Sequence, residues 1–420
     1  MVSTRPAYRP PAPPRSHRLP KHVYWRRRAI TLLSIVTLVV FSYLGVTLVM
    51  ALNNPSFGVS SMARIAEWGR QHGIGGFVTW AETEYYKLHP PKKGGAPPLS
   101  AFGSGATSVH IPKGNHLAPP STIPSPAGTA LPGEGVWHVA GRTTANGTPT
   151  VYEAFVRPNA VNTSYVVGVA WMDPTLLKAQ LYSGSQIPGG GPFKYTAPIT
   201  PAASTTLVAA FNAGFRMQDA HGGYYTQGKM LLPLRQGAAS VVIFKDGTMT
   251  VGAWGEGGLT MGNQIEAVRQ NLDLIVQNGQ PVAGLDAAHS LKWGATLGGT
   301  FNVWRSGLGV TKDGALIYVG GPSLSISDLA NVLVRAGAVR AMELDINTDW
   351  VQYTTYQGPL GSAVNGANGT DLLSSMNGNP GRFFANWWVR DFFTMSLRPN
   401  ELSSATASKS NATSSVTPAG

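Results

Sequence analysis

Two acidic residues at the end of a short apolar segment are the first candidates for chemistry in this sequence. Glu343 and Asp345 lie in the run AVRAMELDINTDW, which covers residues 338–350. Because the side chains of a strand alternate between its two faces, both carboxyl groups are expected on one face. A charged face cannot be buried without partners. The pattern predicts either general acid–base chemistry or an oxygen-ligated cation near Asp345.

The polar residues after this segment imitate the opening of a calcium-binding loop. Asp345, Asn347 and Asp349 alternate as the first ligands of such a loop do. An EF-hand also requires Gly at its sixth position and Glu at its twelfth, where this chain has Trp350 and Tyr356. We therefore exclude an EF-hand. A divalent cation bound near Asp345 in another way stays an alternative, and no other cofactor is expected.

A glycine-rich run after the apolar segment 206–210 is the second candidate site. It reads FNAGFRMQDAHGGYY and covers residues 211–225. Glycine allows close approach of the backbone to a ligand, aromatic rings can stack on a sugar, and histidine exchanges protons near neutral pH. The candidate substrate-binding residues here are Asn212, Gly214, Phe215, His221, Gly222 and Gly223. The alternative is a loop whose polar groups are satisfied within the protein.

Arg305 is the third candidate, in the run WRSGLG at residues 304–309. The planar guanidinium group of arginine suits a phosphate or a carboxylate. An ordinary ion pair, or stacking on an aromatic ring, is the alternative for a single arginine.

The elements that must position these residues are hairpins and one clear helix. Asp-Gly or Asn-Gly turns predict hairpins at 241–251, 272–282 and 308–319. Ser325 and Asp328 form a capping-box pattern before a helix at 326–336, and the strand 339–344 follows directly. This mixture predicts a single strand-rich α+β domain over residues 135–398, built of antiparallel hairpins with a few packed helices.

The N-terminal region predicts a membrane anchor. Residues 29–52 are apolar and uncharged, and at about 1.5 Å per residue they cover the roughly 30 Å hydrocarbon core of a bilayer. Arg26, Arg27 and Arg28 precede this segment, and no acidic residue occurs before Glu67. Positive residues stay inside, so we expect a cytoplasmic N-terminus and an external C-terminal domain. A cleaved signal peptide is the alternative, but its apolar region is usually only about 7–15 residues long.

The remaining segments complete the expected organisation. Residues 1–28 form a basic, proline-rich cytosolic tail, and residues 53–134 combine a juxtamembrane helix at 60–89 with a proline- and glycine-rich stalk. Residues 399–420 form a disordered tail rich in Ser, Thr and Ala.

Composition excludes several functional classes. The chain has no cysteine, which rules out disulfides, thiolate catalysis and Cys-ligated metals. The formal net charge is +12, but most of the excess lies before residue 29, where it indicates membrane topology. We find no basic, aromatic-rich patch and expect no nucleic-acid partner. The oligomeric state stays open.

The order of three motifs resembles the phosphodiester glycosidase family. In that family an FNGGFF-type motif, an R-T-A-x-G motif and an A-L-N-L-D-G-G-G-S motif follow one another. This chain has FNAGF at 211–215, RSGLG at 305–309 and AMELD at 341–345. The resemblance covers residues 202–356. The chain departs from the pattern at Glu343, which replaces Asn, and at 346–349, where INTD replaces the glycine run.

The resemblance implies a hydrolase of glycosyl bonds, with the sugar linked through phosphate. Arg305 would hold the phosphate, Asp345 and Glu343 would supply the catalytic carboxylates, and Asn212 with its loop would bind sugar hydroxyls, as would Asn347 and Asp349. With the predicted anchor, this indicates a membrane-bound enzyme acting outside the cytoplasm on envelope or extracellular polysaccharide. The alternatives are a catalytically inactive glycan-binding module and a structural cell-envelope protein.

Overall fold

The computed structural model describes residues 20–103, 112–186, 188–189, 191–286, 291–294 and 302–403. The chain forms two compact units, Met1–Asn54 and Pro55–Gly420. The first holds helix α1 (Lys21–Leu52), which contains the predicted membrane segment and extends it toward the N-terminus. Within the described residues, α1 is the one helix long and apolar enough to cross a membrane, with a mean hydropathy of 2.4. A signal sequence near the N-terminus has the same properties.

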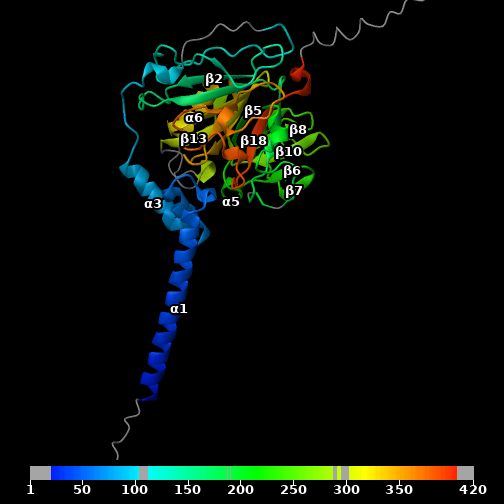
Figure 1. Cartoon of the computed structure of the whole chain (residues 1–420). Coiled ribbons are helices and arrows are strands. Elements are labelled where there is room, and N and C mark those ends of the chain that lie inside the picture. Colours follow the sequence, from blue (N-terminus) through cyan, green and yellow to red (C-terminus); the bar gives the residue numbers. More distant parts are fainter. Residues whose placement is uncertain are drawn as a thin grey trace, which may run out of the picture. The chain divides into compact units, whose positions relative to one another are not determined.

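The second unit is built around an eight-stranded sheet (Figure 1). Its neighbouring strands are all antiparallel. In spatial order they are β1 (His138–Ala140), β2 (Val151–Val156), β3 (Val167–Met172), β14 (Leu316–Leu324), β13 (Val303–Thr311), β15 (Ala338–Asp345), β11 (Leu274–Gln277) and β12 (Gln280–Pro281). The strand that carries Glu343 and Asp345 therefore lies inside this sheet, between β13 and β11.

Two five-stranded antiparallel sheets complete the unit. One has the order β7 (Lys229–Leu232), β6 (Tyr224–Thr226), β10 (Ile265–Gln270), β8 (Ala239–Phe244) and β9 (Met249–Ala253). The other has the order β17 (Gly369–Asp371), β16 (Tyr353–Tyr356), β5 (Leu207–Asn212), β18 (Phe392–Leu397) and β4 (Leu177–Tyr182). Leu308, Val241 and Phe211, one from each sheet, belong to the same buried cluster. The three sheets thus share one hydrophobic core.

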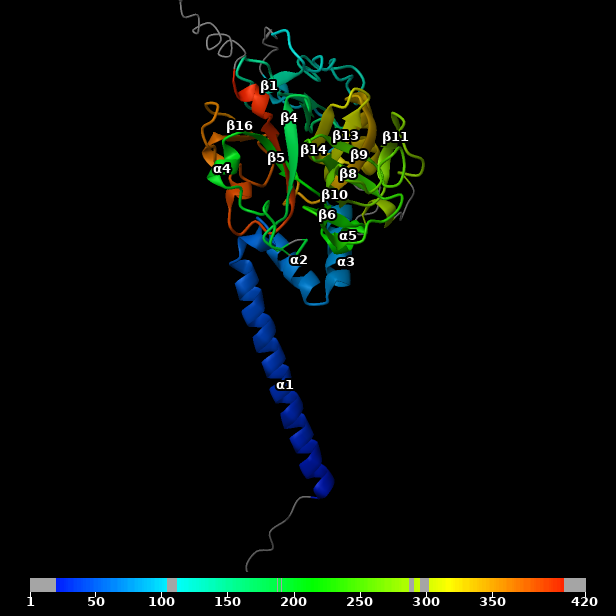
Figure 2. The ribbon, with the colours of Figure 1, turned by 90° about the vertical axis from the view of Figure 1, so that its right-hand side faces the viewer.

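The described part of this unit contains few α-helices. Helix α6 (Ile326–Arg335) begins with the predicted capping box of Ser325 and Asp328, and it buries Leu329, Val332 and Leu333 against the large sheet. Helices α2 (Ser61–Gln71) and α3 (Gly75–Leu88) precede the sheets, while α4 (Pro201–Ser204) and α5 (Met217–Ala220) are single turns. Figure 2 shows α2, α3 and α5 at the same end of this unit.

The α+β prediction is confirmed, and so are all three hairpins, the helix at 326–336 and the strand after it. The helix predicted at 60–89 is divided, because Gly73 adopts a φ of 82° between α2 and α3. Part of the predicted stalk also packs against the domain. Ile123 is buried in the core of the large sheet, and Glu134 pairs with Arg157 beside β2.

Candidate active site

Strand β15 ends in a buried carboxylate with a fixed orientation. Asp345 Oδ1 accepts hydrogen bonds from the backbone N–H groups of Ile346 (2.8 Å) and Asn347 (3.1 Å) as the chain turns away from the sheet. Asp345 Oδ2 accepts a hydrogen bond from Arg390 Nη2 at 3.1 Å. The residue is only 2% exposed. Three donors thus hold this side chain in one position.

Burial raises the pKa of Asp345 to about 6, although Arg390 and the two backbone N–H groups favour its charged form. A carboxyl group with such a pKa can exchange a proton near neutral pH, as a general acid or base must.

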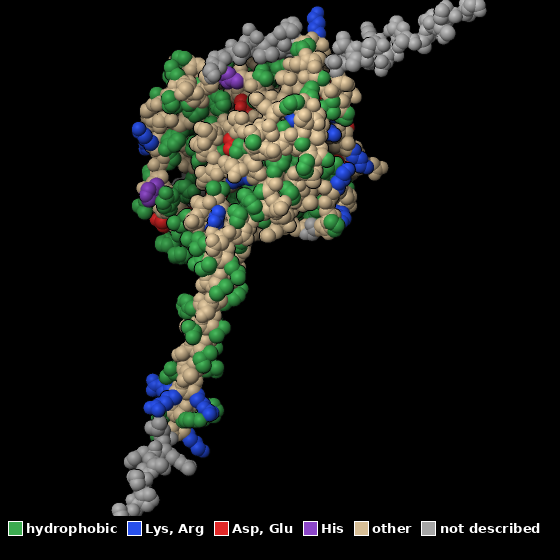
Figure 3. Space-filling view, viewed as in Figure 1, with side chains coloured by type: hydrophobic (Ala, Val, Ile, Leu, Met, Phe, Trp, Pro, Cys, Tyr) green, Lys and Arg blue, Asp and Glu red, His purple; other side chains and the backbone are tan. Residues whose placement is uncertain are grey.

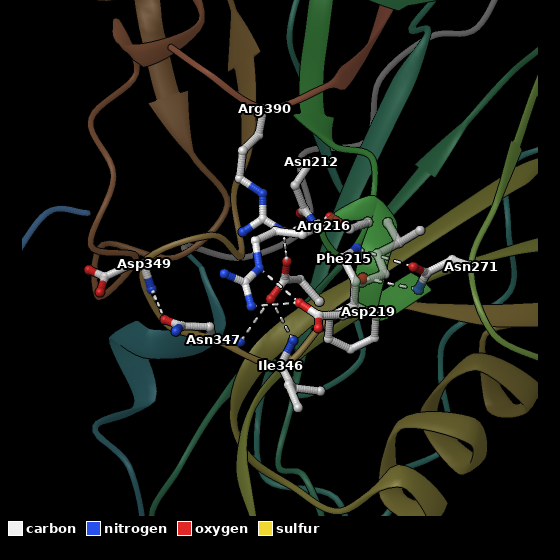
Figure 4. Close-up of polar contacts among 12 residues, drawn as sticks. Asn212, Phe215, Arg216, Asp219, Asn271, Ile346, Asn347, Asp349 and Arg390 are labelled. Carbon is white, nitrogen blue, oxygen red and sulfur yellow. Dashed lines mark hydrogen bonds and ion pairs between the residues drawn. The ribbon is translucent and has the colours of Figure 1, made fainter. Parts of the chain in front are cut away.

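Asp345 borders a pocket formed by five parts of the chain. The described lining residues are Glu67, Arg70, Glu82 and Tyr86 from α2 and α3; Phe215, Arg216 and Asp219 at α5; Gly294; Asp345, Ile346, Asn347 and Trp350 at the end of β15 and after it; and Arg390 before β18. In Figure 4 the guanidinium groups of Arg216 and Arg390 point toward the same space. The pocket therefore combines carboxylates, guanidinium groups and aromatic rings.

Three arginines line the pocket: Arg70 pairs with Glu82 at 2.5 Å, while Arg216 and Arg390 lie nearer Asp345. Arg216 Nη1 pairs with Glu67 at 2.9 Å and Arg216 Nη2 with Asp219 at 2.8 Å. Arg390 donates to Gly214 O at 3.1 Å, and its guanidinium carbon lies 4.4 Å from the centre of the Trp350 ring. Both guanidinium groups already bind oxygen anions, which is the chemistry needed to hold a phosphate.

A network behind the pocket fixes the loop that carries Arg216. The side-chain oxygen of Asn271 accepts the N–H of Phe215 at 3.1 Å, and Asn271 Nδ2 donates to the backbone oxygens of Glu343 and Leu344. Arg269 donates to the carbonyl of Phe215 and forms a fully buried pair with Asp391 at 2.8 Å. This network ties the loop to the end of β15.

Glu343 and Arg305 lie together, but outside the pocket lining. Arg305 Nη1 is 2.6 Å from Glu343 Oε1, and both side chains are fully buried. Arg305 Nε donates to Leu324 O at 2.9 Å. Burial raises the pKa of Glu343 to about 7 against the opposing effect of Arg305. Glu343 precedes Asp345 by two residues and so lies deeper in the sheet. Arg305 thus forms the ordinary ion pair that was the alternative to binding a phosphate.

Asn212 is also engaged inside the protein. Its side-chain oxygen accepts hydrogen bonds from Tyr318 Oη (2.9 Å) and the N–H of Gln352 (3.2 Å), and its Nδ2 donates to Ser306 Oγ (3.1 Å). The amide therefore joins β5 to the large sheet. It does not line the pocket, since all of these partners belong to the core.

Some candidate residues of the glycine-rich loop lie at the pocket, and the others lie away from it. Phe215 lines the pocket, and Gly214 touches it through the hydrogen bond from Arg390. His221 is exposed and not among the lining residues. A Cβ on Gly222 would lie 2.5 Å from Gln270 Cβ, and one on Gly223 would lie 2.4 Å from Pro233 O. These last two glycines serve close packing within the protein.

Of the two candidate residues after β15, one lines the pocket and the other does not. Asn347 lines the pocket and accepts the N–H of Asp349 on its side-chain oxygen at 2.9 Å. Asp349 is buried away from the pocket lining, and its carboxylate is hydrogen-bonded by Asn377 and by the backbone of Val59 and Ser60. Asp349 therefore binds the start of the α2–α3 hairpin.

Comparison with known families identifies part of this framework. Residues 205–345 match the phosphodiester glycosidase family. The match begins just before β5 and ends at Asp345. It therefore contains all three motifs, FNAGF, RSGLG and AMELD, and also Arg216. Arg390 and the α2–α3 hairpin lie outside it. Among curated proteins, none matches this chain significantly.

Two solved structures show distant likeness. The zebrafish N-acetylglucosamine-1-phosphodiester alpha-N-acetylglucosaminidase catalytic domain, auto-inhibited by its pro-peptide, is 14% identical with a TM-score of 0.38, covering 69% of this chain and 97% of that chain. A hypothetical protein from Synechocystis is 14% identical with a TM-score of 0.34, covering 61% of this chain and 63% of that chain. At these values the likeness supports neither a substrate nor an activity.

Sequence reasoning did not identify Arg216, Arg390 or the α2–α3 hairpin as site components. Arg390 could have been suspected from the sequence, because Arg390 and Asp391 are two charged residues inside the apolar run FFANWWVRDFF at 383–393. Charged side chains in such a run need partners in the fold. Arg216 directly follows a motif residue, but its partner Glu67 is 149 positions away. No local pattern indicates that pairing. In the part of the chain that the structure describes, no group of three or more His, Asp or Glu side chains is placed to hold a metal.

Proposed function

We propose that this protein is a membrane-anchored hydrolase that cleaves glycosyl bonds of sugars linked through phosphate, outside the cytoplasm, in envelope or extracellular polysaccharide. The observation that carries the proposal is the pocket itself. Asp345, where the family match ends, lies there in contact with Arg390 and beside Arg216. The apolar helix α1 and the basic residues before it support the anchor and its orientation.

The roles follow from the chemistry of the pocket. Arg216 and Arg390 would hold the phosphate, which would take the place of Glu67 or Asp219 on Arg216, while Arg390 keeps its contact with Asp345. Asp345 would act as the acid–base or nucleophilic carboxylate, as one member of a carboxylate pair does in glycoside hydrolysis. Because Glu343 is not in the pocket lining, the second carboxylate would be Glu82, Glu67 or Asp219. Phe215 and Trp350 offer rings for a sugar face.

A glycan-binding module without turnover is the second candidate. It is favoured by one observation: of the predicted carboxylate pair, Glu343 is bound to Arg305 in the core and Asp345 is bound to Arg390. Such a module would bind the same glycans and release nothing.

The test uses the full chain in lipid nanodiscs with N-acetylglucosamine-1-phosphodiesters and, separately, extracted envelope polysaccharide. Released reducing sugar is measured for the wild type, for Asp345→Asn and for Asp313→Asn, an exposed aspartate in the β13–β14 turn. We expect release by the wild type and by Asp313→Asn, with a loss of about 10²-fold or more in Asp345→Asn. Binding without release in all three proteins would contradict the enzyme and support the binding module.

A further inference from the structure

The α2–α3 hairpin has two different sides. On α3, Glu82 and Tyr86 are one turn apart and line the pocket. Glu84 and Lys87, an exposed ion pair at 2.7 Å, lie on the opposite side of the helix. Phe77, Trp80 and Leu88 lie on that side too, because they are three, four or seven positions from Glu84 or Lys87, or from each other, whereas Glu82 is only two positions from Trp80. The exposed fractions of these three residues are 62%, 57% and 75%.

The outward side forms an exposed apolar surface with its neighbours. Met62 and Ile65, one turn apart on α2, and Ile74 in the turn between the helices are exposed as well. Figure 3 shows hydrophobic side chains gathered at the lower left of the domain, where Figure 1 places α3. We call these six residues, Met62, Ile65, Ile74, Phe77, Trp80 and Leu88, the apolar hairpin face. Exposed apolar patches of this kind mark interaction surfaces.

The chain itself indicates what covers this face. Helix α1 ends at Leu52 and α2 begins at Ser61. The connection 53–60 can span at most about 30 Å when fully extended, and it is shortened by a turn of helix at Pro55–Phe57. If α1 spans a bilayer, the hairpin cannot leave the neighbourhood of its surface. On α3, Phe77, Trp80 and Leu88 lie beside the exposed Glu84–Lys87 ion pair. Helices that lie in the membrane interface combine aromatic and aliphatic side chains with charged ones that reach the headgroups in this way.

We propose that the apolar hairpin face rests on the outer surface of the bilayer that holds α1. Since the pocket residues Glu82 and Tyr86 lie on the other side of α3, the pocket opens one helix diameter, about 10 Å, from the lipid headgroups. The substrate is then a sugar phosphodiester carried on the membrane, such as a lipid-linked glycan. This inference rests on the proposed function for the anchor and for the substrate class.

The first test is possible because the chain contains no cysteine. Single thiols are introduced as Phe77→Cys and Leu88→Cys in the hairpin face, as Val36→Cys in α1, and as Met230→Cys on the exposed strand β7 as the matched control. Each full-chain variant is labelled with an environment-sensitive fluorophore in phosphatidylcholine–phosphatidylglycerol vesicles containing lipids with a nitroxide near the headgroup.

We expect labels at positions 77 and 88 to be quenched several-fold more than the label at 230. Equal quenching at 77, 88 and 230 would overturn the proposal. The label at 36 is measured with lipids that carry the nitroxide in the acyl chain, because this position lies in the hydrocarbon core. If it stays unquenched, the anchor itself fails. If it is quenched while 77 and 88 are not, the anchor stands and only the surface contact is wrong.

The second test separates the surface from the chemistry. The double variant Phe77→Ser/Trp80→Ser is compared with Met230→Ser/Met261→Ser, two exposed methionines elsewhere in the domain. The hairpin variant should cleave a water-soluble sugar phosphodiester at the wild-type rate but lose several-fold on the same phosphodiester attached to a lipid in vesicles. Equal rates of both variants on the vesicle substrate would contradict the proposal. Absence of turnover by every protein, with quenching at 77 and 88 retained, would overturn the enzyme and leave the membrane contact standing.

Discussion

At the scale of residues, two carboxylates on one strand have different surroundings. Asp345 ends β15, where its carboxylate accepts two backbone N–H groups and reaches Arg390 beside the pocket. Glu343 lies two residues deeper and is enclosed with Arg305. Strand alternation places both on one face, but depth along the strand decides which of them can meet a ligand. We infer that the Arg305–Glu343 pair serves the structure and that Asp345 serves the chemistry.

This inference predicts the effect of removing Arg305. Arg305→Met leaves Glu343 fully buried without its cation, which should lower the free energy of unfolding by about 3–5 kcal/mol. Arg305→Met/Glu343→Met, which removes both charges, should recover most of the loss. Denaturant unfolding measures both, with Arg335→Met at the end of α6 as a surface control. A loss in Arg305→Met no larger than in the control would show that the pair is not structural.

At the scale of elements, local signals predicted the hairpins and α6 because their determinants are close in sequence. An Asp-Gly turn or a Ser–Asp capping box acts over a few residues, so β8–β9, β13–β14 and the start of α6 could all be recognised. Phe215 and Asp345, the last residues of the FNAGF and AMELD motifs, could also be recognised from the sequence, and both line the pocket.

The rest of the pocket depends on contacts that no local pattern contains. Arg390 meets Gly214 because β18 pairs with β5, across 176 positions of sequence. Glu67 meets Arg216 because α2 packs at the end of the sheets. The types of Asn212 and Arg305, together with the family resemblance, predict ligand-binding roles, but side-chain partners on neighbouring strands occupy both residues. Residue type shows what a group can bind, and only the pairing of distant strands decides what it does bind.

At the scale of the whole molecule, buried carboxyl groups make stability depend on pH. Glu153 on β2 lies between the large sheet and β16, where Thr355 Oγ1 donates to it at 3.4 Å, and burial raises its pKa to about 7. The pKa values of Glu343 and Asp345 are raised to about 7 and about 6. The folded protein therefore holds these protons over a range in which the unfolded chain has released them. Their contribution to stability is full at pH values below the unfolded pKa values, and it falls as the pH rises toward 7.

Glu153→Gln tests this dependence. The neutral amide cannot ionise, so the variant should gain stability relative to the wild type as the pH rises from 4 to 8, by up to a few kcal/mol. The exposed Glu256→Gln is the control, and the free energy of unfolding is measured at each pH. A constant difference between Glu153→Gln and the wild type across this range would contradict the raised pKa of Glu153.

We propose that the pocket at the end of β15 cleaves the sugar–phosphate bond, with Asp345 and not Glu343 as its reacting carboxylate. The most direct measurement is kcat for an N-acetylglucosamine-1-phosphodiester in Asp345→Asn and Glu343→Gln, side by side with the wild type, at a temperature where all three are folded. We expect Asp345→Asn to lose about 10²-fold or more, while Glu343→Gln stays within about tenfold of the wild type. Turnover that survives in Asp345→Asn and disappears in Glu343→Gln would contradict this proposal.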